Sequence, residues 1–285
     1  MRRKISIIIV NTATKDLTLG CLRSIEKEAR NINFEVLLSD NGSKDGSVEA
    51  LLTLQKEKFW KGRLTLTFND SNVGYAKANN QGIKKAKGEY IFLLNNDTIL
   101  HKNALQNLIK FADKTSDAGI IGSKLLNIDG TLQKSCYHFP TITRAIKEYW
   151  LGYKGYFEKF APMGHNPVTV DSVVGAAFLI TPEARNRVGK LLDERYFAYF
   201  EDIDYCRQTW KKGLKVYYLP DSVITHYHGA TFKMLADEAE RWKKLIPSSK
   251  IYHGLIKHYI INAVLWLGQK WQKVLSWNRL KTRIT

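Results

Sequence analysis

The order of apolar and polar segments predicts an α/β protein built on a mainly parallel sheet flanked by helices. In the first hundred residues, four short apolar runs typical of buried strands alternate with helical patterns, as in βαβ units. The chain has 285 residues, of which 44% are hydrophobic, so it is long enough to bury a sizeable core. It contains no internal repeat and no low-complexity tract.

Each element of the first half follows from a local pattern. Residues 4–10 are β-branched and continuous, as expected of a strand buried on both faces. Helical spacing of apolar residues follows at 16–30, and Gly88 ends the last of three such helices. The expected strands are 4–10, 34–40, 63–68 and 89–94, and the expected helices are 16–30, 47–58 and 74–87.

The second half is less regular. Within residues 119–135 we expect a short strand and a hairpin that turns at Asp129-Gly130. Residues 137–168, rich in aromatic residues, glycine and proline, are expected to form a mobile or substrate-shaping segment. The remaining expected elements are a strand at 170–181, a helix from Pro182, a helix at 201–213, and strands at 214–220 and 222–229.

The net charge indicates which classes of partner the chain can bind, and the cysteine content indicates the redox state of its compartment. Lysine and arginine outnumber acidic residues by 44 to 27, and the net charge of +17 suits polyanions, an anionic membrane surface or phosphate-bearing small molecules. Cys21, Cys136 and Cys206 are far apart and show no disulfide framework or zinc spacing, which fits a reducing compartment. The apolar run 5–10 is too short for a signal peptide, and no stretch reaches the roughly 18 apolar residues of a spanning helix.

Polar residues gather just after the four expected strands of the first half. Ligands of an open α/β sheet bind beyond the carboxyl ends of its strands, so these loops are expected to share one site. Each loop alone is weak support, because turns use Asn, Asp, Gly and Ser anyway. The residues that follow the strands are Asn11-Thr12, Asp40-Asn41-Gly42-Ser43, Asn69-Asp70-Ser71-Asn72 and Asn95-Asn96-Asp97.

The chain lacks the glycine-rich phosphate cradles of dinucleotide-binding and P-loop proteins. A bound nucleoside diphosphate would then need a cation, and Mg²⁺ or Mn²⁺ usually takes one or two carboxylates plus phosphate oxygens. Asp97 is the natural candidate for that carboxylate.

A second acidic group, Glu201, Asp202 and Asp204, begins the expected helix at 201–213. It is either a functional site or a first helical turn that favours the helix dipole. His226 and His228, alternate residues at the end of a strand, are either metal ligands or structural histidines.

Five sequence blocks occur in a specific order between residue 4 and about residue 232. They are ISIIIVNTATKDLTLGCLRSI, SDNGSKDGSVE, NVGYAKANNQGIKKAKGEYIFLLNNDT, VVGAAFLI and DERYFAYFEDIDYCRQTWKKGLKVYYLPDSVITHYHG. In this order they resemble the signatures of family 2 inverting glycosyltransferases, and most closely the rhamnosyltransferase-like branch that builds bacterial O-antigen, capsule and cell-wall polysaccharide. The resemblance implies a GT-A type fold with a Rossmann-like sheet. It assigns 1–232 to the glycosyltransferase domain (1–100 the nucleotide-binding half, 101–232 the acceptor half) and leaves 233–285 as a basic, Trp-rich helical extension.

The resemblance also implies how a nucleotide-sugar donor is held. Asp40 matches the family's base-contacting aspartate, and Asp97 matches the Mg²⁺- or Mn²⁺-binding member of its DxD or NxD motif. Asn95, at the first position of that motif, would lie near the ribose or diphosphate, and His226 matches a histidine that joins the metal or diphosphate. The other candidate donor-binding residues are Asn11, Asn41, Asn72, Gly74, Lys77, Asn96 and Gly175.

The implied reaction is a single displacement with inversion at the anomeric carbon. Asp202 matches the catalytic base that deprotonates a hydroxyl of a glycan or lipid-linked acceptor, with Glu201 beside it. The donor is expected to be a dTDP- or UDP-sugar. Where the family usually has Tyr-Asn after the first strand, this chain has Thr12-Ala13, so an aromatic residue that would pack near the base is missing.

The C-terminal tail differs in composition from the rest. From Arg241 to Thr285 it holds ten Lys or Arg, no Asp or Glu, and four of the seven tryptophans. We expect an interfacial helix on an anionic leaflet, which gives a cytoplasmic enzyme peripheral to the inner face of the cell membrane. The alternatives are a helical cap over the catalytic domain and a homodimer surface.

Two rival classes of protein share some of these features. A sugar-phosphate nucleotidyltransferase would need a glycine-rich basic loop after the first strand, and VNTATKD is a poor one. A non-enzymatic basic polyanion-binding protein would use the +17 charge but would leave the carboxylates unexplained, and no nucleic-acid-binding module is recognisable. We therefore expect a glycosyltransferase with no nucleic-acid partner.

Overall fold

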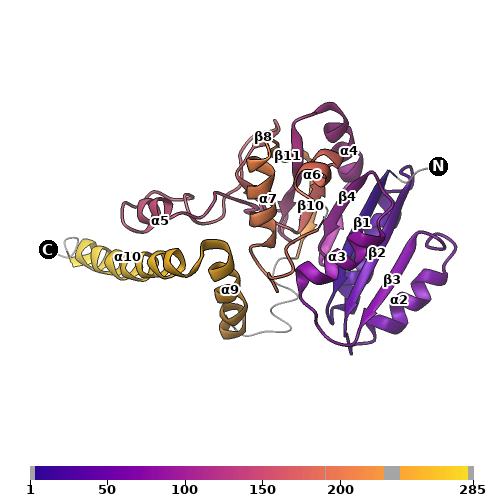
Figure 1. The fold of residues 1–285 in the computed structure, drawn as a ribbon, viewed down its shortest axis with the longest axis horizontal. Coiled ribbons are helices and arrows are strands. Elements are labelled where there is room, and N and C mark those ends of the chain that lie inside the picture. Colours follow the sequence, from indigo (N-terminus) through magenta and orange to yellow (C-terminus); the bar gives the residue numbers. More distant parts are fainter. Residues whose placement is uncertain (1–3, 190, 228–237, 282–285) are drawn as a thin grey trace.

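The computed structural model of the protein describes residues 4–189, 191–227 and 238–281. Within them, nine strands form one sheet: β1 (Ile5–Asn11), β2 (Phe34–Asn41), β3 (Leu64–Asn69), β4 (Tyr90–Leu94), β5 (Thr98–Leu100), β6 (Ala118–Leu126), β8 (Val168–Thr169), β10 (Ala177–Ile180) and β11 (Lys215–His226). The strand order is β3-β2-β1-β4-β10-β6-β11-β5, with β8 paired to β11 (Figure 1). A separate two-stranded ribbon joins β7 (Cys136–Tyr137) to β9 (Ser172–Val173).

Six of the nine described strands point the same way, so the sheet is mainly parallel. β3, β2, β1 and β4 form the parallel half predicted from the first hundred residues, and β6 pairs in parallel with β11. β10 runs antiparallel between β4 and β6, which sets Ala177 opposite Leu94. This reversal brings the residues just before β10 beside the end of β4, where the Asn95 N–H donates to the Ala176 carbonyl at 2.9 Å.

Helices cover both faces of the sheet (Figure 1). They are α1 (Lys15–Glu28), α2 (Ser47–Lys56), α3 (Tyr75–Lys85), α4 (Ala104–Lys114), α6 (Pro182–Arg187) and α7 (Glu201–Lys211). Side chains alternate along β1, so Ile5, Ile7 and Ile9 join the core shared with α1, α2 and α4. Ile8 joins the opposite core with α3, α6 and α7. The continuous apolar pattern of this strand therefore follows from burial on both sides.

The stretch 170–181 is two strands, not the single strand expected from its sequence. The chain leaves the small ribbon after Val173 and joins the main sheet at Ala177, so β9 and β10 belong to different sheets. The three residues between them include Gly175, whose backbone N–H donates to the Asp202 carboxylate and not to a neighbouring strand.

Residues 214–220 and 222–229, expected as two strands, instead form the single strand β11 as far as the structure describes them. The pairing of β11 with β6 shifts register between Leu219 and Val223, around Pro220, which has no N–H to donate. The strand continues past this irregularity because β6, with nine residues, pairs with both parts.

The hairpin expected within 119–135 forms only in part. The chain turns at Asp129-Gly130, where Gly130 has a φ of +80°, but the returning arm makes a single bridge between Leu126 and Leu132. The preceding strand, β6, is a long strand of the central sheet rather than a short arm.

The C-terminal extension is helical, as expected, and packs on the aromatic segment 137–168. This segment carries α5 (Ile142–Tyr149), and α10 (Leu255–Lys281) lies beside it, apart from the sheet (Figure 1). The Trp150 indole N–H donates to the Val264 carbonyl at 3.0 Å. α9 (Glu238–His253) connects this pair of helices to the body. No helix among the described residues has both the length and the apolar character that crossing a membrane requires.

The expected domain boundary at 232/233 and the candidate histidine His228 lie outside the described residues.

Candidate active site

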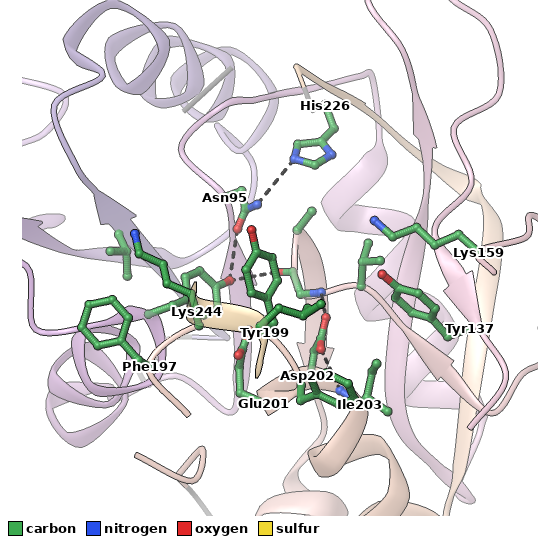
Figure 2. Close-up of a pocket in the computed structure, with 18 of the residues that line it drawn as sticks. Asn95, Tyr137, Lys159, Phe197, Tyr199, Glu201, Asp202, Ile203, His226 and Lys244 are labelled. Atoms are coloured by element: carbon green, nitrogen blue, oxygen red, sulfur yellow. Dashed lines mark hydrogen bonds between the residues drawn. The ribbon is translucent and has the colours of Figure 1, made fainter. Parts of the chain in front are cut away.

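A cavity of about 750 Å³ lies at the carboxyl ends of β1, β2 and β4 (Figure 2). Its lining also includes the break between β9 and β10, the loop that leads into α7, and the end of β11. Side chains as distant in the sequence as Thr12 and Lys244 therefore meet there. This edge of an open α/β sheet is where ligands bind, so the cavity is a candidate active site.

Nine of the thirteen candidate site residues line this cavity. They are Asn41, Asn72, Asn95, Asn96, Asp97, Gly175, Glu201, Asp202 and His226. Those that do not line it are Asn11, Asp40, Gly74 and Lys77. Lys77 is an exposed residue of α3. The other three are buried behind the residues that line the cavity.

Asp40 and Gly74 hold the loops around the cavity in place. The Asp40 carboxylate is 1% exposed and accepts hydrogen bonds from Asn11 Nδ2 at 2.6 Å and from the Ser43 hydroxyl at 2.6 Å. These bonds tie the end of β1 to the loop after β2. Gly74 has a φ of +91°, and a Cβ there would lie 2.8 Å from the Phe197 carbonyl oxygen, so only glycine fits this close approach.

The side-chain amide of Asn96 is directed toward β1 and the start of α1. Its Nδ2 lies 3.1 Å from Asn11 Oδ1, 2.6 Å from Thr14 Oγ1 and 2.8 Å from Thr18 Oγ1. All four groups are buried, so the loop after β4 is fixed by a network that excludes water. With Asn96 turned inward, the residues on either side of it are presented to the cavity.

Asp97 and His226 form one polar group of the cavity. The Asp97 side chain is 4% exposed, and its Oδ1 has no hydrogen-bond partner among the described atoms. That oxygen lies 3.3 Å from His226 Nε2. Gln133 Nε2 donates to Asn127 Oδ1 and to the His226 carbonyl, so Gln133 Oε1 is left to accept from His226 Nδ1 at 2.7 Å. In neutral His226 the proton is therefore on Nδ1, and Nε2 carries a lone pair.

This arrangement fits a divalent cation. A carboxylate oxygen and an imidazole lone pair that face each other repel unless a proton or a cation lies between them. Two neighbouring ligands of an octahedral Mg²⁺ or Mn²⁺ would be about 3.0 Å apart for bonds of about 2.1 Å, close to the observed 3.3 Å. Within the described part of the chain no cluster of three or more His, Cys, Asp or Glu side chains is placed to hold a metal ion, so Asp97 and His226 would be two of its ligands and not a complete set.

Asp202 and Glu201 form a second polar group, at the start of α7 (Figure 2). Each oxygen of the Asp202 carboxylate accepts one backbone hydrogen bond, from the Gly175 N–H and from the Ile203 N–H, both at 2.8 Å. The preceding residues, Tyr199 and Phe200, have φ values of +69° and +71°. Two consecutive left-handed residues without glycine are costly and are often found at functional sites.

The two carboxyl groups differ in their affinity for protons. Burial raises the pKa of the Asp202 carboxyl, although its two hydrogen bonds and the nearby Lys159 ammonium oppose the shift. Burial and the adjacent Asp202 raise the pKa of Glu201 well above its ordinary value. Glu201 Oε2 has no hydrogen-bond partner among the described residues. Glu201 therefore holds a proton more readily than Asp202, whose carboxylate form is stabilised by its two backbone hydrogen bonds.

Several residues that the sequence did not single out also build the site. The Tyr75 hydroxyl lies 3.1 Å from both Asn95 Oδ1 and the Gly175 carbonyl, joining three parts of the wall. Lys159, from the aromatic segment, lines the cavity, and burial lowers its pKa. The composition of residues 137–168 predicted a mobile or substrate-shaping segment, and Lys159 belongs to it. In contrast, nothing in the local sequence around Gln133 predicts its contact with His226.

Comparison with known families and proteins identifies relatives of this chain. The sequence profile described as Glycosyl transferase family 2 matches residues 6–175. The O-antigen biosynthesis protein RfbC of Myxococcus xanthus is 28% identical over 84% of this chain, but the match spans only 18% of that protein. An N-acetylglucosaminyl-diphospho-decaprenol L-rhamnosyltransferase of Mycobacterium tuberculosis is 26% identical over 73% of this chain and 76% of the relative.

Solved structures with the same fold include two transferases. GalNAc-T7, in a complex with UDP, GalNAc and Mn²⁺, has a TM-score of 0.62 at 17% identity, over 79% of this chain and 44% of that chain. The mannosyltransferase PcManGT from Pyrobaculum calidifontis, in a complex with GDP-Man and Mn²⁺, has a TM-score of 0.59 at 17% identity, over 94% and 70%. At such identities the likeness shows the fold alone, and it confirms the predicted GT-A type.

Proposed function

This chain belongs to glycosyl transferase family 2, and from this premise we propose that it transfers a sugar, with inversion, from a dTDP- or UDP-sugar to a hydroxyl of a glycan or lipid-linked acceptor. Family membership makes it a glycosyltransferase and sets aside the nucleotidyltransferase and polyanion-binding alternatives. The names of its relatives in O-antigen and diphospho-decaprenol chemistry support a role in cell-surface polysaccharide synthesis.

The observation that carries this proposal is the pairing of two unlike acidic groups across one cavity. Asp97 presents a buried carboxylate oxygen that has no hydrogen bond and faces His226. Asp202 presents a carboxylate whose oxygens are oriented by two backbone N–H groups. A displacement at an anomeric carbon needs positive charge near the leaving diphosphate and a base near the attacking hydroxyl.

We assign the donor diphosphate to the Asp97 side of the cavity. Asp97 and His226 would hold Mg²⁺ or Mn²⁺, with Asn95 beside them, 3.4 Å from His226 Nε2. A divalent cation bound there supplies positive charge against the diphosphate as it leaves. Asn41 and Asn72, which line the same cavity at the ends of β2 and β3, would receive the nucleoside. Contact between Asp40 and the base stays a prediction, and Asp40 also acts by fixing the loop that carries Asn41.

Asp202 is assigned as the catalytic base. Each of its oxygens has already accepted one hydrogen bond, which fixes the carboxylate plane and leaves a lone pair on each oxygen for the acceptor hydroxyl. As the oxygen of that hydroxyl attacks the anomeric carbon, its proton passes to Asp202 and the bond to the diphosphate breaks. Glu201 holds a proton more readily than Asp202, and we assign it a supporting role in which it donates a hydrogen bond to a substrate oxygen.

A donor panel tests the proposal. The thermal midpoint of the full chain would be measured with Mn²⁺ and UDP-, dTDP- or GDP-sugars, with each nucleotide alone as a control. We expect stabilisation by a UDP- or dTDP-sugar that depends on the metal and is lost in Asp97→Asn. If no donor stabilises the protein in the presence of Mn²⁺, the proposed function is wrong.

A further inference from the structure

Between Leu255 and Gln272, one exposed face of α10 is mainly apolar. Residues at helical spacing on this face have exposed fractions between 42% and 78%. The large apolar side chains of this face are Leu255, Ile256, Tyr259, Ile260, Trp266, Leu267 and Trp271. A helix at the surface of a soluble protein normally exposes polar residues. This face of α10 exposes large apolar residues instead.

The opposite face of α10 accounts for its packing, so the apolar face is not needed for the fold. His258, Ile261 and Gly268 are buried there. A Cβ on Gly268 would lie 2.7 Å from the Tyr149 side chain, which shows how closely α10 approaches α5. The residues that the structure describes therefore leave most of the apolar face exposed.

The apolar face continues onto α5, and α5 is joined to the cavity. The Trp150 ring stacks on Trp271 with centroids 6.5 Å apart, and Leu151, next in the chain, is 63% exposed. Tyr137 and Lys159, on the two sides of α5 in the sequence, both line the cavity.

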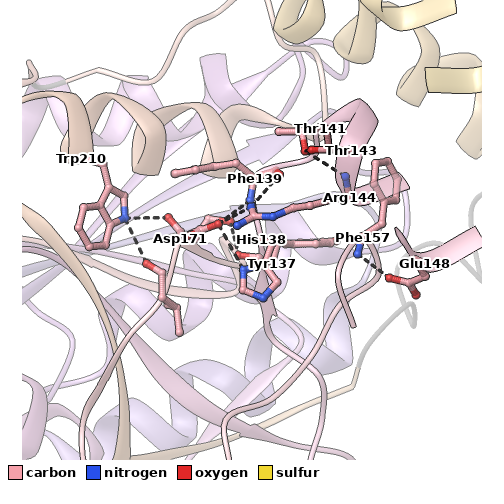
Figure 3. Close-up of polar contacts among 12 residues, drawn as sticks. Tyr137, His138, Phe139, Thr141, Thr143, Arg144, Glu148, Phe157, Asp171 and Trp210 are labelled. Atoms are coloured by element: carbon pink, nitrogen blue, oxygen red, sulfur yellow. Dashed lines mark hydrogen bonds and ion pairs between the residues drawn. The ribbon is translucent and has the colours of Figure 1, made fainter. Parts of the chain in front are cut away.

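Hydrogen bonds and an ion pair fix α5 relative to the cavity (Figure 3). Asp171 accepts from the Arg144 guanidinium at 2.6 Å and from the Phe139 N–H at 3.0 Å. The Glu148 carboxylate accepts from the Phe157 N–H, which ties the returning chain to the helix. A surface that binds the apolar face would therefore lie at a fixed position relative to the part of the cavity lined by Lys159.

Basic side chains lie beside and among the apolar residues of this face. The Lys270 ammonium lies 3.6 Å from the centre of the Trp266 ring, and the Lys250 ammonium lies 5.4 Å from the centre of the Tyr259 ring. Lys257 is exposed beside Ile256, and residues 241–285 contain no acidic residue. Amphipathic residues with apolar stems and cationic heads suit the boundary between lipid chains and anionic headgroups.

We propose that the apolar face of α10, extended by Trp150 and Leu151, docks onto an anionic lipid bilayer and holds the cavity at the membrane surface. This inference rests on the proposed function in that it makes the acceptor a lipid-linked one, reached from the α5 side. A second copy of the chain is a poorer occupant. A symmetric dimer through this face would bring the same lysines together without an acidic partner on α10.

Vesicle co-sedimentation of the full chain tests the docking surface. The variants are Ile256→Glu and Leu267→Glu, singly and together, and the matched control is Gln269→Glu, an exposed residue off the apolar face. We expect binding to vesicles with phosphatidylglycerol and little binding to pure phosphatidylcholine. The double variant should bind at least tenfold more weakly, equivalent to about 1.4 kcal/mol, and the control should stay within twofold.

Other outcomes would overturn this inference. Unchanged binding by the double variant, or equal binding to both vesicle types, rules out an anionic docking surface here. A dimer in sedimentation velocity that Leu267→Glu dissociates, without vesicle binding, would assign the face to a second copy. Metal-dependent donor binding, measured on the same samples, should be unchanged in all variants. Its absence in the wild type would instead refute the proposed function.

Discussion

The two acidic groups of the cavity are both buried, yet the structure prepares them for different ligands. Asp97 has an oxygen with no hydrogen bond, and that oxygen faces the Nε2 of His226. Asp202 has both oxygens hydrogen-bonded to backbone N–H groups and a lysine nearby. The first environment offers a carboxylate oxygen and an imidazole nitrogen to one ligand, and the second stabilises a carboxylate that can take up a proton. Burial alone therefore does not assign a role to a carboxylate, whereas its hydrogen-bond partners do.

The largest effect is expected from Asp202→Asn. The amide keeps the shape of the carboxylate but cannot accept the acceptor proton, so transfer should fall by about 10²–10⁴-fold, the range for a general base. Donor binding should be unchanged, because the diphosphate is assigned to the other group. Steady-state transfer and calorimetric donor binding would be measured side by side. Turnover within tenfold of wild type would remove Asp202 as the base.

Asp97→Asn should have the next largest effect, and its signature is different. The variant should lose the Mn²⁺ dependence of donor binding, and transfer should fall about 100-fold because the leaving diphosphate is less well neutralised. Titration of Mn²⁺ in the presence of the nucleotide measures this. Chelation of metal in the wild type should reproduce the loss, whereas a variant that still needs Mn²⁺ would place the metal elsewhere.

Gln133→Ala tests whether the orientation of His226 matters. Removing the acceptor for the Nδ1 proton frees the ring and its tautomer, so the apparent affinity for Mn²⁺ should fall about tenfold, within the ~10–100-fold typical of such supporting residues. Gln106→Ala, remote from the cavity, is the matched control. Gln133→Met, which keeps the bulk of the side chain but offers His226 Nδ1 no comparable acceptor, should lower the affinity as Gln133→Ala does. If Gln133→Met keeps the wild-type affinity, Gln133 acts through packing alone.

Glu201→Gln should have the smallest effect on transfer, within about threefold, because a protonated glutamic acid resembles the amide. Its effect on stability depends on pH. The raised pKa means that folded Glu201 binds a proton where the unfolded chain has lost it, so stability is lost as pH rises through this interval. The variant removes that loss, and its melting temperature should exceed that of wild type near pH 7 by on the order of 2–4 °C. The difference should vanish near pH 4, and a difference that persists there would contradict a protonated Glu201.

The sequence predicted the parallel half of the sheet because its strands and helices follow from local patterns. β1 alternates between two cores, so its continuous apolar run was sufficient to identify it. The division of 170–181 into β9 and β10 could not be predicted, because residues 173–180 contain no polar side chain to mark the break and only the tertiary path separates the two strands. The three-residue strand β5 is stabilised by its partner β11, more than a hundred residues away.

The candidate site was predictable only to the level of residue types at strand ends. The family motifs predicted Asp97 and Asp202, and the structure brings both to one cavity. Sequence alone could not show that Asn96 turns inward to Thr14 and Thr18, since the motif presents three adjacent polar residues alike. The contact between Gln133 and His226 spans 93 positions and has no local signature.

Calorimetric titration of the preferred nucleoside diphosphate, with and without Mn²⁺, into Asp97→Asn and Asp202→Asn tests the central claim most directly. If Asp97 is prepared for a cation and Asp202 for a proton, Asp202→Asn will bind as wild type does in the presence of Mn²⁺. Asp97→Asn will bind weakly and equally with and without the metal. The claim is contradicted if Asp202→Asn loses the metal-dependent binding or if Asp97→Asn retains it.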